Sequence, residues 1–256
     1  MKFSSRLLRK GTLIPETRVV FQRWQDGESV AANVQVALAD NPTGARSANW
    51  LHEVVATLRT RLGEMPATEL RSLAALARSG VSDPVWQACL HWHAARVDAL
   101  YYPFMTEWLF TEYQRDADRL SAADVAPWVR QQVAALKGED AALSEYGVIR
   151  AARDLLRTAA DYGVLSRTLL KTFPPYRLPD AALLYLLHAL AETTPNARRL
   201  LESPDWRLYR LEASEVEREV LRLHQHRQLH YDAAGSLAQL TLPYPSAADY
   251  AQSLPP

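Results

Sequence analysis

Apolar residues recur at helical spacing along almost the whole chain, and this periodicity restricts the possible folds more than any other feature. The clearest stripe ends near Gly63 and comprises Trp50, Leu51, Val54, Val55, Leu58 and Leu62. Side chains at i, i+3, i+4 and i+7 lie on one face of an α-helix, so such a stripe predicts a helix with one buried face. We therefore expect a mainly α, compact multi-helix protein.

Prolines and short polar residues indicate where these helices begin and end. Asp83 before Pro84 predicts an N-cap followed by proline at the first helical position. The aromatic-rich helix that follows, over residues 85–113, is expected to break near Pro103, because proline removes a backbone donor. A short strand is expected from Leu169 to Thr172.

The polar stretch from Leu136 to Asp140 contains a glycine and interrupts the helical pattern. Glycine and clustered polar residues are typical of linkers, so this stretch is the best candidate for a domain boundary. We predict an N-terminal helical domain over residues 1–137 and a C-terminal helical, winged-helix-like domain over residues 138–256. One continuous globule is the alternative.

The segment from Ala213 to Leu242 is the most distinctive, because a capped amphipathic helix runs directly into two strand-like segments. Ser214 and Glu217 stand in the S-x-x-E spacing of a capping box, which satisfies backbone N–H groups at a helix start. One face of the helix is apolar, and the opposite face carries Arg218 and Arg222.

The two strand-like segments, Leu229–Asp232 and Leu237–Leu242, alternate apolar with polar residues. Gly235 lies between them and supplies a residue that tolerates positive φ, so the pattern predicts a β-hairpin. A helix followed by such a hairpin suggests a winged helix, which is a common way to contact a DNA duplex.

The charges of the chain balance, because 29 basic residues accompany 29 acidic ones among its 256 residues. This balance argues against a strongly basic nucleic-acid binder, although a local patch can bind phosphates on a neutral protein. Apolar residues make up 48% of the chain and charged residues 23%, which is typical of an ordinary soluble globular protein.

The lone cysteine and the short apolar runs bear on the location of the protein. Cys89 cannot form an internal disulfide, which fits a reducing compartment. The longest apolar run, Ala181 to Ala191, is far shorter than the roughly 20 residues that span a bilayer. We expect a cytoplasmic protein with no transmembrane segment and no membrane partner.

Motifs of the common catalytic and nucleotide-binding sites are absent: there is no G-x-x-x-x-G-K-[ST] loop, G-x-G-x-x-G turn, G-x-S-x-G elbow or H-E-x-x-H pair. Cys89 and His93 share a helix face while His91 points away, which favours packed histidines over a metal site. A second cluster of possible metal ligands comprises His224, His226 and His230, but no cysteine or nearby carboxylate completes a four-ligand site there. We expect no catalytic residues, no cofactor and no metal.

Arg150, Arg153 and Arg157 fall at i, i+3 and i+7 and line one face of a helix. They form a solvated face if Asp154 and Asp161 pair with Arg150 and Arg157 at i,i+4. Arg153 and Arg157, however, are like charges at i,i+4, and a bound anion would relieve their repulsion. All three are therefore candidate nucleic-acid contacts.

The N-terminal run Lys2, Arg6, Arg9 and Lys10 contains no acid before Glu16. Such an arm could lie along a phosphate backbone, or it could form a frayed, soluble terminus. These four basic residues are candidate nucleic-acid contacts as well, together with the two arginines of the C-terminal helix.

Short motifs near both ends of the chain carry a resemblance to a known family. They are KGTLIPET (Lys10–Thr17), Asn41 followed by RSA (Arg46–Ala48), LRTRL (Leu58–Leu62), YDAAG (Tyr231–Gly235) and LTLP (Leu240–Pro243). In these segments the chain resembles BrxA, a component of the bacteriophage exclusion (BREX) defence systems of bacteria.

The resemblance implies a small, mainly helical, non-enzymatic protein that binds double-stranded DNA. It also implies that the protein works beside the methyltransferase, the phosphatase-like protein and the ATPase of the BREX system. A similarity of the family's fold to the NusB RNA-binding antitermination factor keeps RNA open as a ligand. The family has no catalytic signature to transfer, so the candidate contacts rest on charge and spacing.

A protein-interaction scaffold within the defence complex is the main alternative to DNA binding. Glu215, Glu217 and Glu219 support it, because they place negative charge on or beside the C-terminal helix. They also argue against base reading by that helix, so the expected DNA contacts are mainly to backbone phosphates. An enzyme such as a nuclease is disfavoured, because no spaced carboxylate cluster with an accompanying lysine is evident.

Overall fold

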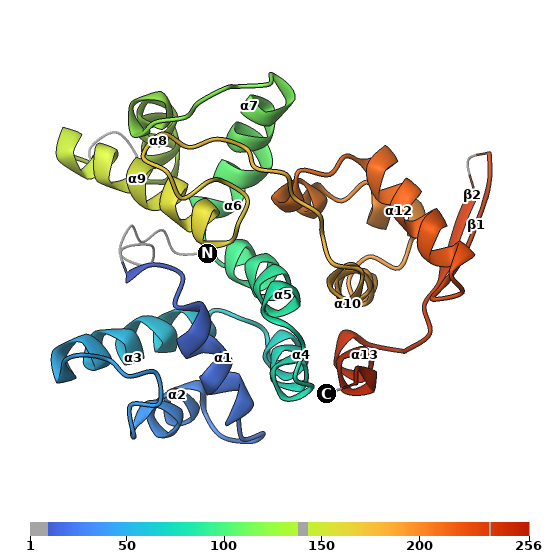
Figure 1. The fold of residues 1–256 in the computed structure, drawn as a ribbon, viewed down its shortest axis with the longest axis horizontal. Helices are drawn as coiled ribbons and strands as arrows, with labels where there is room; N and C mark the ends of the chain where they lie inside the picture. Colours follow the sequence, from blue (N-terminus) through green and yellow to red (C-terminus); the bar gives the residue numbers. More distant parts are fainter. Residues whose placement is uncertain (1–9, 138–142, 236, 256) are drawn as a thin grey trace.

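Helices make up most of the protein in this computed structural model, which describes residues 10–137, 143–235 and 237–255 (Figure 1). Near the C-terminus two short strands pair as an antiparallel hairpin. The expectation of a mainly α protein with a helix and hairpin at its end is confirmed. The Lys2, Arg6 and Arg9 candidates lie outside the described residues.

The apolar stripe that the periodicity predicts lies on one of four N-terminal helices. They are α1 (Ile14–Gln22), α2 (Val30–Leu38), α3 (Ala48–Gly63) and α4 (Ala67–Arg78). Helix α3 buries Val54, Leu58 and Leu62, while Trp50 at its first turn is 37% exposed. The apolar face of the helix is therefore the face that meets α2.

Helix α5 (Asp83–Arg96) runs through the centre of the molecule (Figure 1). Its N-cap is Ser82, so the prediction that Asp83 caps the helix is wrong by one residue. The helix ends at Arg96 and the next one begins at Tyr101, so the predicted break near Pro103 is present but lies before the proline. Asp98 causes the earlier break, because its Oδ1 accepts the backbone N–H groups of Leu100 and Tyr101 at 2.9 and 2.8 Å and so starts a new helix.

Three short helical segments follow this break: α6 (Tyr101–Pro103), the π-helical turn η2 (Phe104–Leu109) and α7 (Phe110–Gln114). Pro103 lies in the first turn of the new helix, where its missing N–H costs nothing. Proline therefore continues a helix at this position instead of ending one.

Helices α8 (Ala122–Lys137) and α9 (Glu145–Asp161) flank the predicted domain boundary and pack against each other. Helix α9 ends before Gly163, whose φ of 76° suits the residue after a helix. One cluster of buried apolar side chains includes residues from both predicted domains. The division at residue 138 itself stays a prediction.

The second half of the chain packs back onto the first. Helix α10 (Asp180–Ala191) lies against α5, and the last helix, α13 (Ala247–Ser253), lies against α4, so the C-terminus ends beside the N-terminal helices (Figure 1). Between them come the short helix α11 (Ala197–Leu201) and the 3₁₀ turn η4 (Pro204–Tyr209).

Helix α12 (Ala213–Gln225) has a capping box, but not at the predicted residues. Glu212 is the N-cap and Glu215 is its partner, whose Oε2 accepts the backbone N–H of Glu212 at 2.9 Å. Glu217 instead accepts the hydroxyl of Tyr231 at 2.7 Å and ties the helix to the hairpin. The predicted capping box of Ser214 and Glu217 is therefore wrong, because the helix begins earlier than that pair requires and Glu212 is its N-cap.

The hairpin pairs β1 (His230–Ala234) with β2 (Leu237–Thr241), and Ala234 faces Leu237 at the turn. Gly235 has a φ of 61°, as the turn prediction requires. The strand predicted from Leu169 to Thr172 is wrong, since Lys171 forms only a single bridge, with Leu120.

None of the helices in the described ranges is long and apolar enough to cross a membrane.

Candidate nucleic-acid interface

Helix α9 separates an apolar face from a basic one. Its buried side includes Val148, Ala152, Leu155, Leu156 and Ala159, and Ser144 caps its start by accepting the N–H of Gly147 at 3.2 Å. The opposite side carries the three predicted arginines. Arg153 and Arg157 are exposed, and Arg150 is half-buried. We call Arg150, Arg153 and Arg157 the arginine stripe.

Two residues of the arginine stripe, Arg150 and Arg153, differ from most other predicted contacts in their ion pairing within the described ranges. Among the described residues neither Arg150 nor Arg153 forms an ion pair with a carboxylate, so the predicted pairing of Arg150 with Asp154 is not formed. On the neighbouring helix α8, by contrast, Arg130 lies 2.7 Å from Glu145. Arg23 is similarly placed, 2.7 Å from Asp40. The arginine stripe therefore differs from exposed arginines that already have an anionic partner.

Tyr146 extends the arginine stripe by one turn and was not predicted as a site residue. It lies four residues before Arg150, hence on the same helical face, and it is 72% exposed. An exposed aromatic ring beside arginines can stack on a base or a sugar. The i,i+4 spacing was readable in the sequence, but the exposure of the ring was not.

The described end of the N-terminal basic arm approaches the arginine stripe. Lys10 forms an ion pair with Glu53 on α3, and its ammonium lies 5.2 Å from the ring centre of Trp50. Gly11 follows, and a Cβ atom added to it would lie 3.4 Å from Nη2 of Arg157. Two of the three predicted basic groups thus meet at Gly11.

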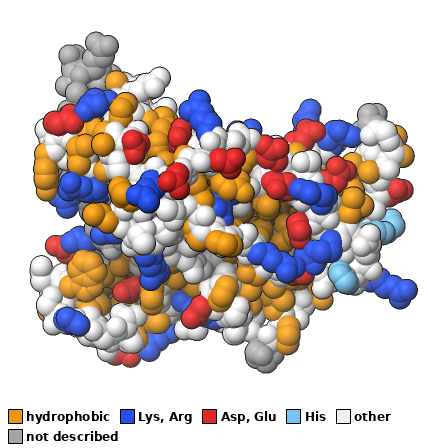
Figure 2. All heavy atoms as spheres, turned by 45° about the horizontal axis from the view of Figure 1, so that its top comes forward, with side chains coloured by type: hydrophobic (Ala, Val, Ile, Leu, Met, Phe, Trp, Pro, Cys, Tyr) orange, Lys and Arg blue, Asp and Glu red, His pale blue; other side chains and the backbone are white. Residues whose placement is uncertain are grey.

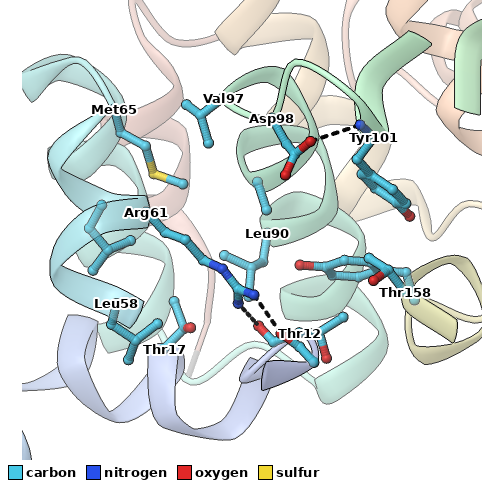
Figure 3. A pocket seen from close by; sticks show the side chains of 14 residues that line it. Thr12, Thr17, Leu58, Arg61, Met65, Leu90, Val97, Asp98, Tyr101 and Thr158 are labelled. Atoms are coloured by element: carbon cyan, nitrogen blue, oxygen red, sulfur yellow. Dashed lines mark hydrogen bonds between the residues drawn. The ribbon is translucent and has the colours of Figure 1, made fainter. Parts of the chain in front are cut away.

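Arg61 holds this meeting point in place. Its Nη2 donates to the carbonyl of Gly11 at 2.7 Å and its Nη1 to the carbonyl of Thr12 at 3.1 Å (Figure 3). Burial lowers the pKa of Arg61, the nearby Tyr162 and Asp98 oppose this, and the charge of Arg157 lowers it further. Even so, an arginine remains protonated at neutral pH.

A small cavity of about 40 Å³ adjoins Arg61 between α3, α5 and α9. Figure 3 shows Asp98 on the far side of this cavity from Thr12, with Leu90 between them. Burial raises the pKa of Asp98, although the N–H groups of Tyr101 and Leu100 and the charge of Arg61 oppose this. The cavity has room for only a few water molecules.

The third predicted basic group lies elsewhere. Arg222 on α12 donates to both carboxylate oxygens of Asp180 at 2.8 and 2.7 Å and to Glu219 at 2.9 Å. Arg218 lies 3.6 Å from Glu215. In Figure 1, α12 is in the right half of the molecule and α9 is in the left half. The predicted contacts therefore do not form one surface.

The overall charge distribution is mixed. Figure 2 shows basic and acidic side chains interleaved over one face, with apolar side chains between them. Positive charge that can bind an anion is therefore confined to small groups of side chains, as the zero net charge of the chain suggested.

The histidines and the cysteine of α5 are engaged inside the protein. His93 lies between Glu69 and Tyr185, at 2.7 and 2.9 Å, and Nε2 of His91 lies 3.0 Å from the hydroxyl of Tyr101. Burial lowers the pKa of His91 to about 3 and raises that of the Cys89 thiol. Within the described ranges no group of three or more His, Cys, Asp or Glu side chains could hold a metal ion.

A family model described as BrxA matches residues 1–188. Searches of curated proteins and of solved structures found no match.

Proposed function

Because the chain belongs to the BrxA family and so has a role in BREX phage defence, we propose that it binds double-stranded DNA through the arginine stripe and the N-terminal arm. The contacts go mainly to backbone phosphates. In this role the protein works without catalysis of its own, beside the methyltransferase, the phosphatase-like protein and the ATPase of the system.

One observation carries the proposal: Arg150 and Arg153 project from a rigid helix with no carboxylate partner among the described residues. An arginine that is already paired must break an ion pair before it can bind a phosphate, whereas an unpaired one only releases water. Tyr146 on the same face adds a ring that can pack against the DNA backbone. Arg157 lies on the same helix, next to Gly11 at the described end of the N-terminal arm.

The test is a titration of labelled duplex at several salt concentrations with the full chain. For each phosphate contact, the logarithm of the association constant should fall by roughly 0.9 for every tenfold increase in salt concentration. Arg153→Glu should weaken binding to all sequences about equally and reduce the salt slope by about 1. Arg71→Glu, which changes an exposed arginine of α4, is the matched control and should bind as the unaltered protein does.

A flat salt response, no binding at low salt, or equal losses for Arg153→Glu and Arg71→Glu would refute the proposal. A labelled RNA duplex and single strand in the same titration decide between DNA and RNA. Tighter binding to RNA at every salt concentration would replace the DNA assignment.

A protein-interaction scaffold is the second candidate, and the ion pairs of α12 favour it for that helix. Arg222 and Arg218 are both engaged with carboxylates, so this face offers a phosphate little free charge. Leu221 on α12 and Leu237 on β2 are 41% and 76% exposed. Co-purification with another BREX component that survives nuclease treatment, and that Leu237→Asp abolishes, would support this role.

A further inference from the structure

The loop after α9 presents the most exposed apolar side chain among the large hydrophobic residues described. Leu169 is 96% exposed and its neighbour Leu170 is 43% exposed. Removing apolar surface from water is favourable, so two leucines that remain in contact with water can gain free energy by binding an apolar partner. Arg167 and Lys171 flank the pair in the sequence.

The loop is held in one conformation by its own hydrogen bonds. Ser166 and Thr172 close it, since the N–H of Ser166 donates to the carbonyl of Thr172 at 3.0 Å and the N–H of Thr172 donates to Oγ of Ser166 at 2.9 Å. Lys171 exchanges two backbone hydrogen bonds of 2.8 Å with Leu120. Such a loop presents its tip at little entropic cost on binding.

The loop also adjoins the end of the arginine stripe. Arg167 lines a surface cleft together with Thr12 and Asp161, the last residue of α9. Asp161 is next to Arg157, because both lie within 4 Å of a Cβ atom added to Gly11. The charge of Asp161 also reaches Lys171, where it opposes the lowering of the lysine pKa by burial. The base of the loop, at Arg167, therefore lies near Arg157 at the end of the arginine stripe, with Asp161 close to both arginines.

We propose that Leu169 and Leu170 form a wedge that inserts between base steps of the bound duplex and bends it. This inference rests on the proposed DNA binding. Apolar wedges flanked by cations unstack one base step and kink the duplex by roughly 20–90°. Arg167 is exposed and has no ion-pair partner among the described residues, so it is placed to contact the phosphate beside the inserted leucine.

The size and surroundings of the tip favour DNA over a protein partner. A stable protein interface buries about 800 Å² per partner, and the residues on either side of the two leucines are polar or charged. A gap between base pairs needs only one or two apolar side chains and a nearby cation. The position beside the arginine stripe favours DNA over a lipid surface.

The experiment measures energy transfer between dyes at the two ends of a short duplex. Binding of the full chain should raise the transfer, and Leu169→Ser with Leu170→Ser should abolish that rise. The double variant should retain its salt-dependent binding with an affinity loss of no more than about tenfold, because the phosphate contacts remain. Leu221→Ser, which changes a leucine of α12 that is about as exposed as Leu170, should bend DNA as the unaltered protein does.

A second duplex with a central mismatch, which is already easy to kink, should be bound more tightly than matched duplex by the unaltered protein but not by the double variant. Binding without a change in energy transfer, or equal bending by the double variant, would overturn the wedge and leave the DNA-binding proposal standing. No binding at all would overturn both. Loss of binding to anionic vesicles in the double variant, with DNA bending unchanged, would identify a lipid-binding loop instead.

Discussion

Nδ1 of His93 lies 2.7 Å from Oε2 of Glu69, and this contact joins the central helix α5 to α4. Nε2 of the same ring lies 2.9 Å from the hydroxyl of Tyr185 on α10. His93 is fully buried, so both of its ring nitrogens depend on protein partners. A single side chain on α5 thus connects α4, in the first half of the chain, to α10, in the second half.

Removal of Glu69 should destabilise the protein. Glu69→Ala leaves a buried ring nitrogen of His93 without its partner and deprives Arg96 of a carboxylate at 2.9 Å, so we expect a loss of about 1–3 kcal/mol in the free energy of unfolding. Urea titration measures it. Glu28→Ala, which removes an exposed glutamate, is the control. Equal midpoints for the two variants would show that the contact contributes nothing.

Stability should fall in mild acid because of His91. Burial holds its pKa near 3 in the folded protein, against about 6.5 when unfolded. A histidine that is neutral when folded binds more protons when unfolded, so its contribution is complete above pH 6.5 and is lost as the pH falls towards 3. His91→Phe should therefore reduce the slope of unfolding free energy between pH 7 and pH 5, as measured by urea titration at each pH. An unchanged slope would mean that the pKa of His91 is the same in the folded and the unfolded protein.

Loss of Arg61 should release the start of the chain. Arg61→Ala removes the donors to the carbonyls of Gly11 and Thr12, so a lysine-specific protease should cut faster after Lys10. The variant keeps all four lysines of the chain, so the possible cleavage sites do not change. Arg59→Ala, an exposed arginine on the same helix, should be cut at the original rate. Similar rates for the two variants would contradict the anchoring role.

The contact between Arg222 and Asp180 should couple α12 to α10. A double-mutant cycle with Arg222→Ala and Asp180→Ala should give a coupling energy of about 1 kcal/mol, since the pair is bidentate but partly exposed to solvent. The coupling should weaken in high salt. The more exposed pair of Arg218 and Glu215 should show none that can be measured. Additive effects at Arg222 and Asp180 would refute a stabilising bridge.

Local sequence patterns predicted the features that depend on neighbouring residues. The apolar stripe of α3, the basic face of α9 and the hairpin around Gly235 all follow from spacing within one element. Side chains on one helix face or in one turn are placed by the local backbone, so their grouping is readable without the fold. For the same reason the family resemblance at Lys10–Thr17 was visible in the sequence, and the match over residues 1–188 confirms it.

Only the tertiary structure decided which side chains meet across the fold. The carboxylate of Asp98 accepts the N–H groups of Leu100 and Tyr101, so a new helix starts before Pro103. Lys171 pairs with Leu120 in a single bridge instead of extending a strand. Asp180, 42 residues before Arg222, neutralises that arginine, whereas Arg150 and Arg153 have no such partner among the described residues. The sequence by itself determined where charges and apolar faces lie along each helix. The packing of distant segments determined which charges remain available, because ion pairs form wherever the fold brings opposite charges together.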